Sequence, residues 1–68
     1  MKLIREIRVD DWVFSLYFSK GQYHSFVYKN GCQQVHVVLS VDDDEASARK
    51  WHKQYVRECL SQIEQGAM

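Results

Sequence analysis

The side chains most suited to chemistry in this sequence are two cysteines and three histidines. Four of them, Cys32, His36, His52 and Cys59, have the ligand types of a zinc site. Zinc sites are usually built from ligands paired at short spacing, such as two cysteines two to four residues apart, and these cysteines are far apart. The periodicities described below also place the first two residues and the last two on opposite sides of a sheet. The sequence therefore predicts no metal site and no cofactor.

Catalysis is not expected either. A cysteine nucleophile with a histidine base would have to combine Cys59 with His24, and a thiol buried among apolar side chains has a raised pKa. The acidic run Asp42, Asp43 and Asp44 is typical of the solvated start of a helix. No glycine-rich phosphate loop occurs, and a domain two layers thick has little room for a pocket of several hundred cubic ångströms. We therefore predict a non-enzymatic protein.

The length and composition indicate a single small α+β domain, residues 1–68. The chain has 68 residues, of which 46% are hydrophobic, and nine Lys and Arg balance nine Asp and Glu. This balance lacks the basic surplus of a dedicated nucleic-acid-binding domain. No apolar run approaches the roughly 20 residues that cross a bilayer, and the opening residues lack the apolar stretch of a signal peptide. A cytoplasmic protein with free thiols and no membrane partner is expected.

Hydrophobic periodicity predicts strands followed by one helix. Apolar and polar residues alternate in four segments, and the predicted strands are residues 3–9, 12–19, 23–29 and 33–41. The period then becomes helical over residues 43–64, with Asp42 or Asp43 at the N-cap and Gly66 at the end. The expected fold is an antiparallel meander of three or four strands with one C-terminal helix packed on one face, in two layers.

Two turn signals set the predicted register. Asn30-Gly31 is a strong signal for a two-residue hairpin. Unbroken alternation from this turn puts His24, Phe26 and Tyr28 on the helix side, and a three-residue loop at residues 20–22 then brings the preceding strand into agreement. The predicted core is Phe14, Leu16, Phe18, Phe26, Val35, Val37, Leu39, Trp51, Tyr55 and Cys59.

The same register leaves the second face of the sheet uncovered. This face keeps aromatic side chains and has few charges, which is the composition of an interface core. The residues predicted to bind a partner are Tyr17, Tyr23, Ser25, Val27, Lys29, Gln34, His36 and Val38.

Residues 12–57 resemble the small DNA-binding module at the front of phage-type integrases, which is related in shape to the plant AP2 domain. The resemblance depends on Gly21-Gln22-Tyr23, on the turn at residues 30–31, and on the spacing of Ala48 and Trp51. It implies a sheet face that contacts DNA, with Lys20 and Lys29 as the matching basic residues. In size, single domain and neutral charge, the chain is also similar in kind to small phage-encoded inhibitors, including some anti-CRISPR proteins.

The predicted function is that of a non-catalytic protein-binding module, an inhibitor or adaptor of a phage or mobile element that acts through the exposed sheet face. The partner is either a second copy of the chain or a different protein. The alternative is a small DNA-binding protein that uses the same face in the manner of integrase modules.

Overall fold

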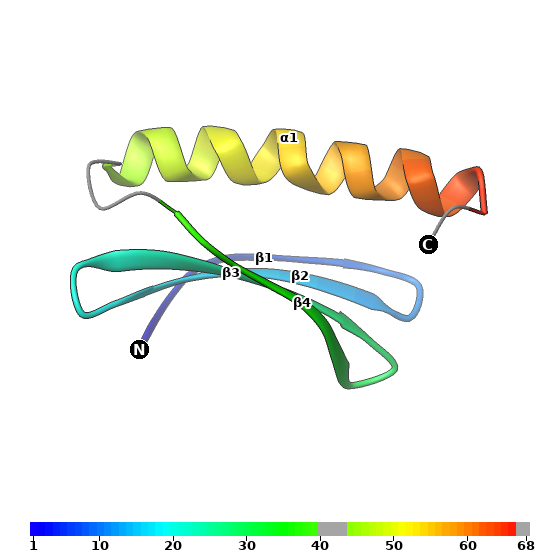
Figure 1. Cartoon of the computed structure of the whole chain (residues 1–68), viewed down its shortest axis with the longest axis horizontal. Coiled ribbons are helices and arrows are strands. Elements are labelled where there is room, and N and C mark those ends of the chain that lie inside the picture. Colours follow the sequence, from blue (N-terminus) through cyan, green and yellow to red (C-terminus); the bar gives the residue numbers. More distant parts are fainter. Residues whose placement is uncertain (40–43, 67–68) are drawn as a thin grey trace.

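A computed structural model describes residues 1–39 and 44–66 of the chain. The four strands form one antiparallel sheet in sequence order, and one helix lies along one face of it (Figure 1). The elements are β1 (Lys2–Val9), β2 (Trp12–Ser19), β3 (Gln22–Lys29), β4 (Cys32–Val38) and α1 (Glu45–Glu64). The predicted α+β fold is confirmed, in its four-stranded form. In the described part of the chain, no helix is long and apolar enough to cross a membrane.

All three hairpins close with two-residue turns. The first turn residue is left-handed in each, with φ of 53° at Asp10, 52° at Lys20 and 53° at Asn30. Gly21 and Gly31 follow with φ of 79° and 80°, as the type I′ turn favoured by twisted strands requires. The predicted three-residue loop at residues 20–22 is therefore wrong, because its last residue already pairs within the sheet.

A β-bulge in β4 changes the pairing of the last hairpin. Tyr28 pairs with Gln33, whereas the preceding residue Val27 pairs with Val35, so Gln34 is an extra residue without a partner. Since side chains alternate between faces, one extra residue moves the remainder of the strand to the other face. The bulge thus lets Val35 and Val37 share a face with Val27 instead of with its neighbours.

The two-residue turn and the bulge together exchange the two faces of β3 relative to the prediction. Tyr23, Ser25 and Val27 lie on the helix side, and the exposed fractions of the last two are 1% and 0%. The alternate residues His24, Phe26 and Tyr28 face away from the helix. Their predicted placement in the core is wrong, because the sequence pattern was carried through residues 33 and 34 as if no bulge were there.

The core consists of two apolar clusters between the sheet and α1. Near the start of the helix, Ala48 packs with side chains of the sheet and the segment after β4, namely Leu16, Tyr23 and Leu39. Toward its end, Val56 and Cys59 pack with Trp12, Phe14 and Val27. Of the predicted core, Phe14, Leu16, Leu39 and Cys59 are buried, and Phe18, Val35, Val37, Trp51 and Tyr55 are partly buried.

Both ends of α1 are capped. The N-cap is Asp44, whose carboxylate accepts a hydrogen bond of 2.8 Å from the Ser47 N–H. At the other end Gly66 has a φ of 73°, and its N–H donates to the Ile63 carbonyl at 3.0 Å, so the predicted end of the helix is confirmed. The predicted caps at positions 42 and 43 lie outside the described residues. The predicted strand 33–41 is too long, because β4 ends at Val38 and the described Leu39 already lies beyond it.

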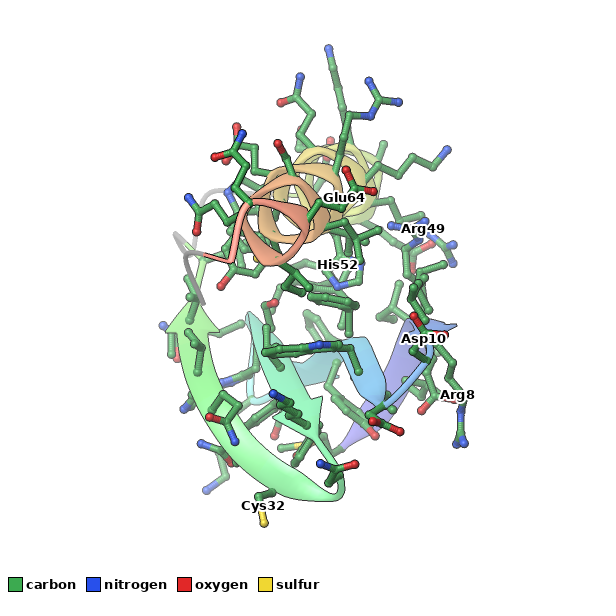
Figure 2. The ribbon with its side chains drawn as sticks, turned by 90° about the vertical axis from the view of Figure 1, so that its right-hand side faces the viewer. Arg8, Asp10, Cys32, Arg49, His52 and Glu64 are labelled. Atoms are coloured by element: carbon green, nitrogen blue, oxygen red, sulfur yellow. The ribbon has the colours of Figure 1, made fainter. Side chains whose placement is uncertain are left out.

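A buried polar contact joins β1 to the middle of α1. Figure 2 shows His52 pointing from the helix toward the sheet, and its side chain has no exposed surface. Its Nδ1 lies 3.0 Å from a guanidinium nitrogen of Arg5. Because a guanidinium only donates, Nδ1 accepts and the imidazole is neutral. Burial, with a smaller contribution from Arg5, lowers the pKa of His52 to about 4.

The assignment of Leu16 and Phe26 to opposite faces predicts different mutational effects. We expect Leu16→Ala to lower the free energy of unfolding by about 2–5 kcal/mol, because it leaves a cavity in the core. Phe26→Ala should lower it by clearly less, since this ring is only partly buried on the uncovered face. Urea denaturation of both variants measures the difference. Equal losses would contradict the assigned faces.

Burial of neutral His52 predicts a dependence of stability on pH. Its pKa falls from 6.5 to about 4 on folding, so the unfolded chain binds more protons between these values. The free energy of unfolding should therefore rise with pH across this window and reach its full value above it. In urea denaturation between pH 5 and 7, His52→Leu should flatten this rise.

The readout is the slope of the unfolding free energy against pH. The absolute free energy is not used, because His52→Leu also leaves Arg5 without its acceptor. The matched control is His36→Gln, which replaces an exposed histidine and leaves His52 in place. Identical slopes in the wild-type and His52→Leu chains would show that His52 does not titrate on unfolding.

Candidate functional site

The sheet face that points away from α1 is the candidate site, and we call it the open face. In the described part of the chain, no helix or strand lies over it (Figure 1). The register assigns to it Leu3, Glu6, Arg8, Val13, Ser15, Tyr17, Ser19, Gln22, His24, Phe26, Tyr28, Gln33, His36 and Val38.

Five aromatic rings, those of Tyr17, His24, Phe26, Tyr28 and His36, form one cluster on this face, which we call the aromatic platform. Phe26 is at its centre. The ring of Phe26 lies parallel to that of His36, with centroids 4.4 Å apart and planes 8° apart. Tyr17 meets it edge-on at 5.8 Å, and Tyr28 lies beside it at 6.1 Å. Phe26 is thus partly covered by its neighbours on the open face, and not by the helix.

Two imidazoles of the platform are bonded to each other. His24 Nδ1 lies 3.0 Å from His36 Nε2, while the centres of the two rings are 5.3 Å apart. The nitrogens lie between the ring centres, so the rings meet edge to edge and not face to face. Two neutral imidazoles make this contact when the N–H of one ring donates a hydrogen bond to the unprotonated nitrogen of the other. Both nitrogens are therefore directed at one shared point on the exposed surface.

The centre of the open face carries no charged side chain. The charged residues that the register assigns to this face are Glu6 and Arg8 on the edge strand β1, and they form an ion pair of 3.2 Å. Figure 2 shows Arg8 projecting away from the helix at this edge. Lys29, expected here from the sequence, belongs to the helix side, where its Nζ lies 5.3 Å from the centre of the Trp12 ring. The aromatic platform is therefore uncharged while its histidines are neutral.

The structure places the residues predicted from the sequence in three groups. Tyr17, His36 and Val38 lie on the open face, and Gln34 is the exposed bulge residue beside it. The predicted open-face positions of Tyr23, Ser25, Val27 and Lys29 are wrong, because their row of β3 lies on the helix side. Burial raises the pKa of the Tyr23 phenol, and the carboxylates of Glu45 and Asp44 at the start of α1 add to this.

Sequence reasoning missed His24, Phe26 and Tyr28 as site residues. The signal that identifies them is Lys20-Gly21, which forms an ordinary two-residue turn. Given that turn, the pairing of β2 with β3 puts all three residues opposite the face of Phe14 and Leu16. The bulge in β4 leaves no comparable signal, because residues 33 and 34 are both glutamine.

The cysteines do not form a reactive or metal-binding centre with the histidines. In Figure 2, Cys32 points away from the sheet at the tip of its hairpin, far from His52 on the helix. Among residues 1–39 and 44–66, no group of three or more His, Cys, Asp and Glu side chains is placed to hold a metal ion. Burial raises the pKa of the Cys59 thiol, so this thiol is not activated as a nucleophile.

A pocket of about 360 Å³ lies on the helix side, between the β1–β2 turn and the end of α1, so the expectation that a two-layer domain lacks room for such a pocket is wrong. Its lining consists of Val9, Asp10, Asp11, Trp12, Lys29, Leu60, Ile63 and Glu64. The pocket contains no histidine, cysteine or hydroxyl nucleophile, and Lys29 lies over its aromatic wall. The charged side chains of its lining are those of Asp10, Asp11, Lys29 and Glu64.

Comparison of the chain with protein-family models, with curated proteins and with solved structures finds no match. The resemblances to integrase DNA-binding modules and to phage-encoded inhibitors therefore stay predictions from the sequence.

Proposed function

We propose that this chain is a non-catalytic protein-binding module, an adaptor or an inhibitor of the phage-encoded kind, that acts by covering a surface of another protein with its open face. The observation that carries the proposal is the aromatic platform, which gathers five rings on an uncovered face without a charged side chain among them. Enrichment in aromatic residues and depletion of charge distinguish the core of a protein interface from ordinary surface.

The dimensions of the open face suit a small interface. The 21 Å extent of the chain runs from α1 to the sheet, so the face measures 34 Å by 15 Å (Figure 1). It presents about 500 Å², which places it at the smaller end of interfaces, below the roughly 800 Å² that each partner contributes to a standard one. Leu3 and Val38, on the two edge strands, are 48% and 47% exposed and extend the apolar surface to both edges. The ion pair of Glu6 and Arg8 supplies a polar rim at one of these edges.

The positions of the basic residues favour a protein partner over a nucleic acid. Binding to phosphates depends on lysine and arginine side chains that neutralise them. On the open face this role would fall to Arg8, which is already paired with Glu6, while Lys29 lies over Trp12 on the other side. We propose the cytoplasm as the compartment, since Cys32 and Cys59 are both free thiols.

Site-specific cross-linking tests the proposed interface. A photoreactive phenylalanine analogue at position 26 should cross-link the chain to its partner in extracts of its source, because position 26 is the centre of the aromatic platform. The same analogue at Lys53, on the exposed side of α1, is the matched control and should give no product. Tyr17→Ser should reduce the product from position 26.

Sedimentation of the purified chain then separates the two kinds of partner. A dimer lost in Tyr17→Ser identifies a second copy, whereas a monomer with a heavier cross-linked product identifies a different protein. A monomer that gives no product from position 26, or gives one only from position 53, would show that the open face is not the interface.

A gel-shift experiment at low salt tests the DNA-binding alternative. We expect no retarded band with single- or double-stranded DNA, because the open face offers too few free cations. A band that weakens steeply with salt and disappears in a Lys20→Glu, Lys29→Glu chain would instead favour the DNA-binding function.

A further inference from the structure

The bonded pair of imidazoles on the open face brings two potential metal ligands close together. His24 Nδ1 and His36 Nε2 face each other at 3.0 Å, and imidazole nitrogens are common ligands of transition metals. At a zinc–nitrogen distance of about 2.0–2.1 Å, two ligands of a tetrahedral ion lie roughly 3.3–3.4 Å apart. A separation greater by a few tenths of an ångström would thus admit an ion in place of the shared proton.

We propose that His24 and His36 form a two-histidine site for a divalent transition-metal ion of the zinc type. This inference goes beyond the proposed function and does not depend on it, because both protein ligands come from one chain. The sequence predicted no metal site here, since its register placed His24 and His36 on opposite faces. The bulge at Gln34 is what brings them to the same face.

The backbone holds the two ligands in place. His24 is opposite Val38 and His36 is opposite Phe26 in the ladder between β3 and β4, so the histidines are diagonal neighbours on adjacent strands. The ring of His36 also lies parallel to Phe26, 4.4 Å away. This contact lets the imidazole slide and turn within its own plane, which is the plane that contains its nitrogen lone pairs. Both rings must turn in this way, because their lone pairs now point directly at each other.

The proton balance is simple at this site. In the bonded pair, one proton lies between the two facing nitrogens. When the ion binds, that proton moves through solvent to the outer nitrogen of the same ring, so that both imidazoles stay neutral. His24 then carries its proton on Nε2 and His36 on Nδ1. The remaining coordination positions point away from the sheet, toward water or toward a protein that covers the open face.

Zinc titration of the untagged protein tests this site, with the imidazole nitrogens followed by long-range ¹H–¹⁵N NMR. We expect His24 Nδ1 and His36 Nε2 to shift with saturation, and the ring of buried His52, which bonds Arg5, to stay unchanged. His24→Gln and His36→Gln should each weaken zinc affinity by at least about tenfold, a loss typical even of an outer-shell partner.

Two controls separate this proposal from its alternatives. Cys32→Ser removes the exposed thiol, the other accessible soft ligand on the β3–β4 hairpin, and should leave zinc affinity unchanged. Lys53→Ser changes an exposed residue of α1, on the other side of the sheet from both histidines, and should also leave zinc affinity unchanged. The proposal is wrong if neither imidazole shifts up to millimolar zinc, or if binding is lost in Cys32→Ser and kept in His24→Gln. Since the first readout is made on the wild-type chain, it stands even if a variant does not fold.

Discussion

The structure depends on one constraint: a single helix covers only one face of a four-stranded sheet. A helix of 20 residues is about 30 Å long, which nearly matches the 34 Å length of the whole chain. α1 therefore shields the sheet along its length but reaches only one side. The large apolar row of β2, which includes Trp12, Phe14 and Leu16, must face α1, because in a chain of this size it has no other cover. The pairing of the other strands follows from that requirement.

The alternation of residues between the two faces, which we call the parity of the strands, satisfies this constraint. Each two-residue turn keeps directly opposed residues on the same face, so β2 brings Tyr23 and Val27 to the helix side. The bulge at Gln34 then lets Val35 join them. The same parity also brings Ser25 into the core, where its hydroxyl has no partner in the structure, and such a group costs about 1–3 kcal/mol. The register is thus a compromise that favours the apolar row of β2.

This compromise places three polar residues under α1, of which Ser25 and His52 are buried and Arg5 is partly buried. Arg5 and Ser25 are on opposite sides of Leu16 in one row across the sheet, and His52 contacts Arg5 from the helix. A register shifted by one residue would leave Arg5 and His52 without each other. Such buried polar contacts are best attested as devices that select one register, and here that is the register that exposes Phe26 and the rest of the aromatic platform. The open face is thus a consequence of how the core is packed.

The elements and their order were determined by the sequence alone. Period-two and helical patterns locate the strands and α1 to within a few residues, because these patterns reflect local geometry. The helix face of Trp51, Tyr55 and Cys59 was also predicted correctly to face the core, since helical periodicity does not depend on neighbouring elements. The sequence contained a turn signal, Lys20-Gly21, for the buried face of β3, but the choice between a two- and a three-residue turn, and the bulge in β4, were decided only in the tertiary structure. One residue in a turn or a bulge reverses every side chain that follows, and the glutamines at the bulge carry no local sign of it. The sequence therefore indicated that one face is left open, and the strand pairing decided that His24, Phe26 and Tyr28 lie on it.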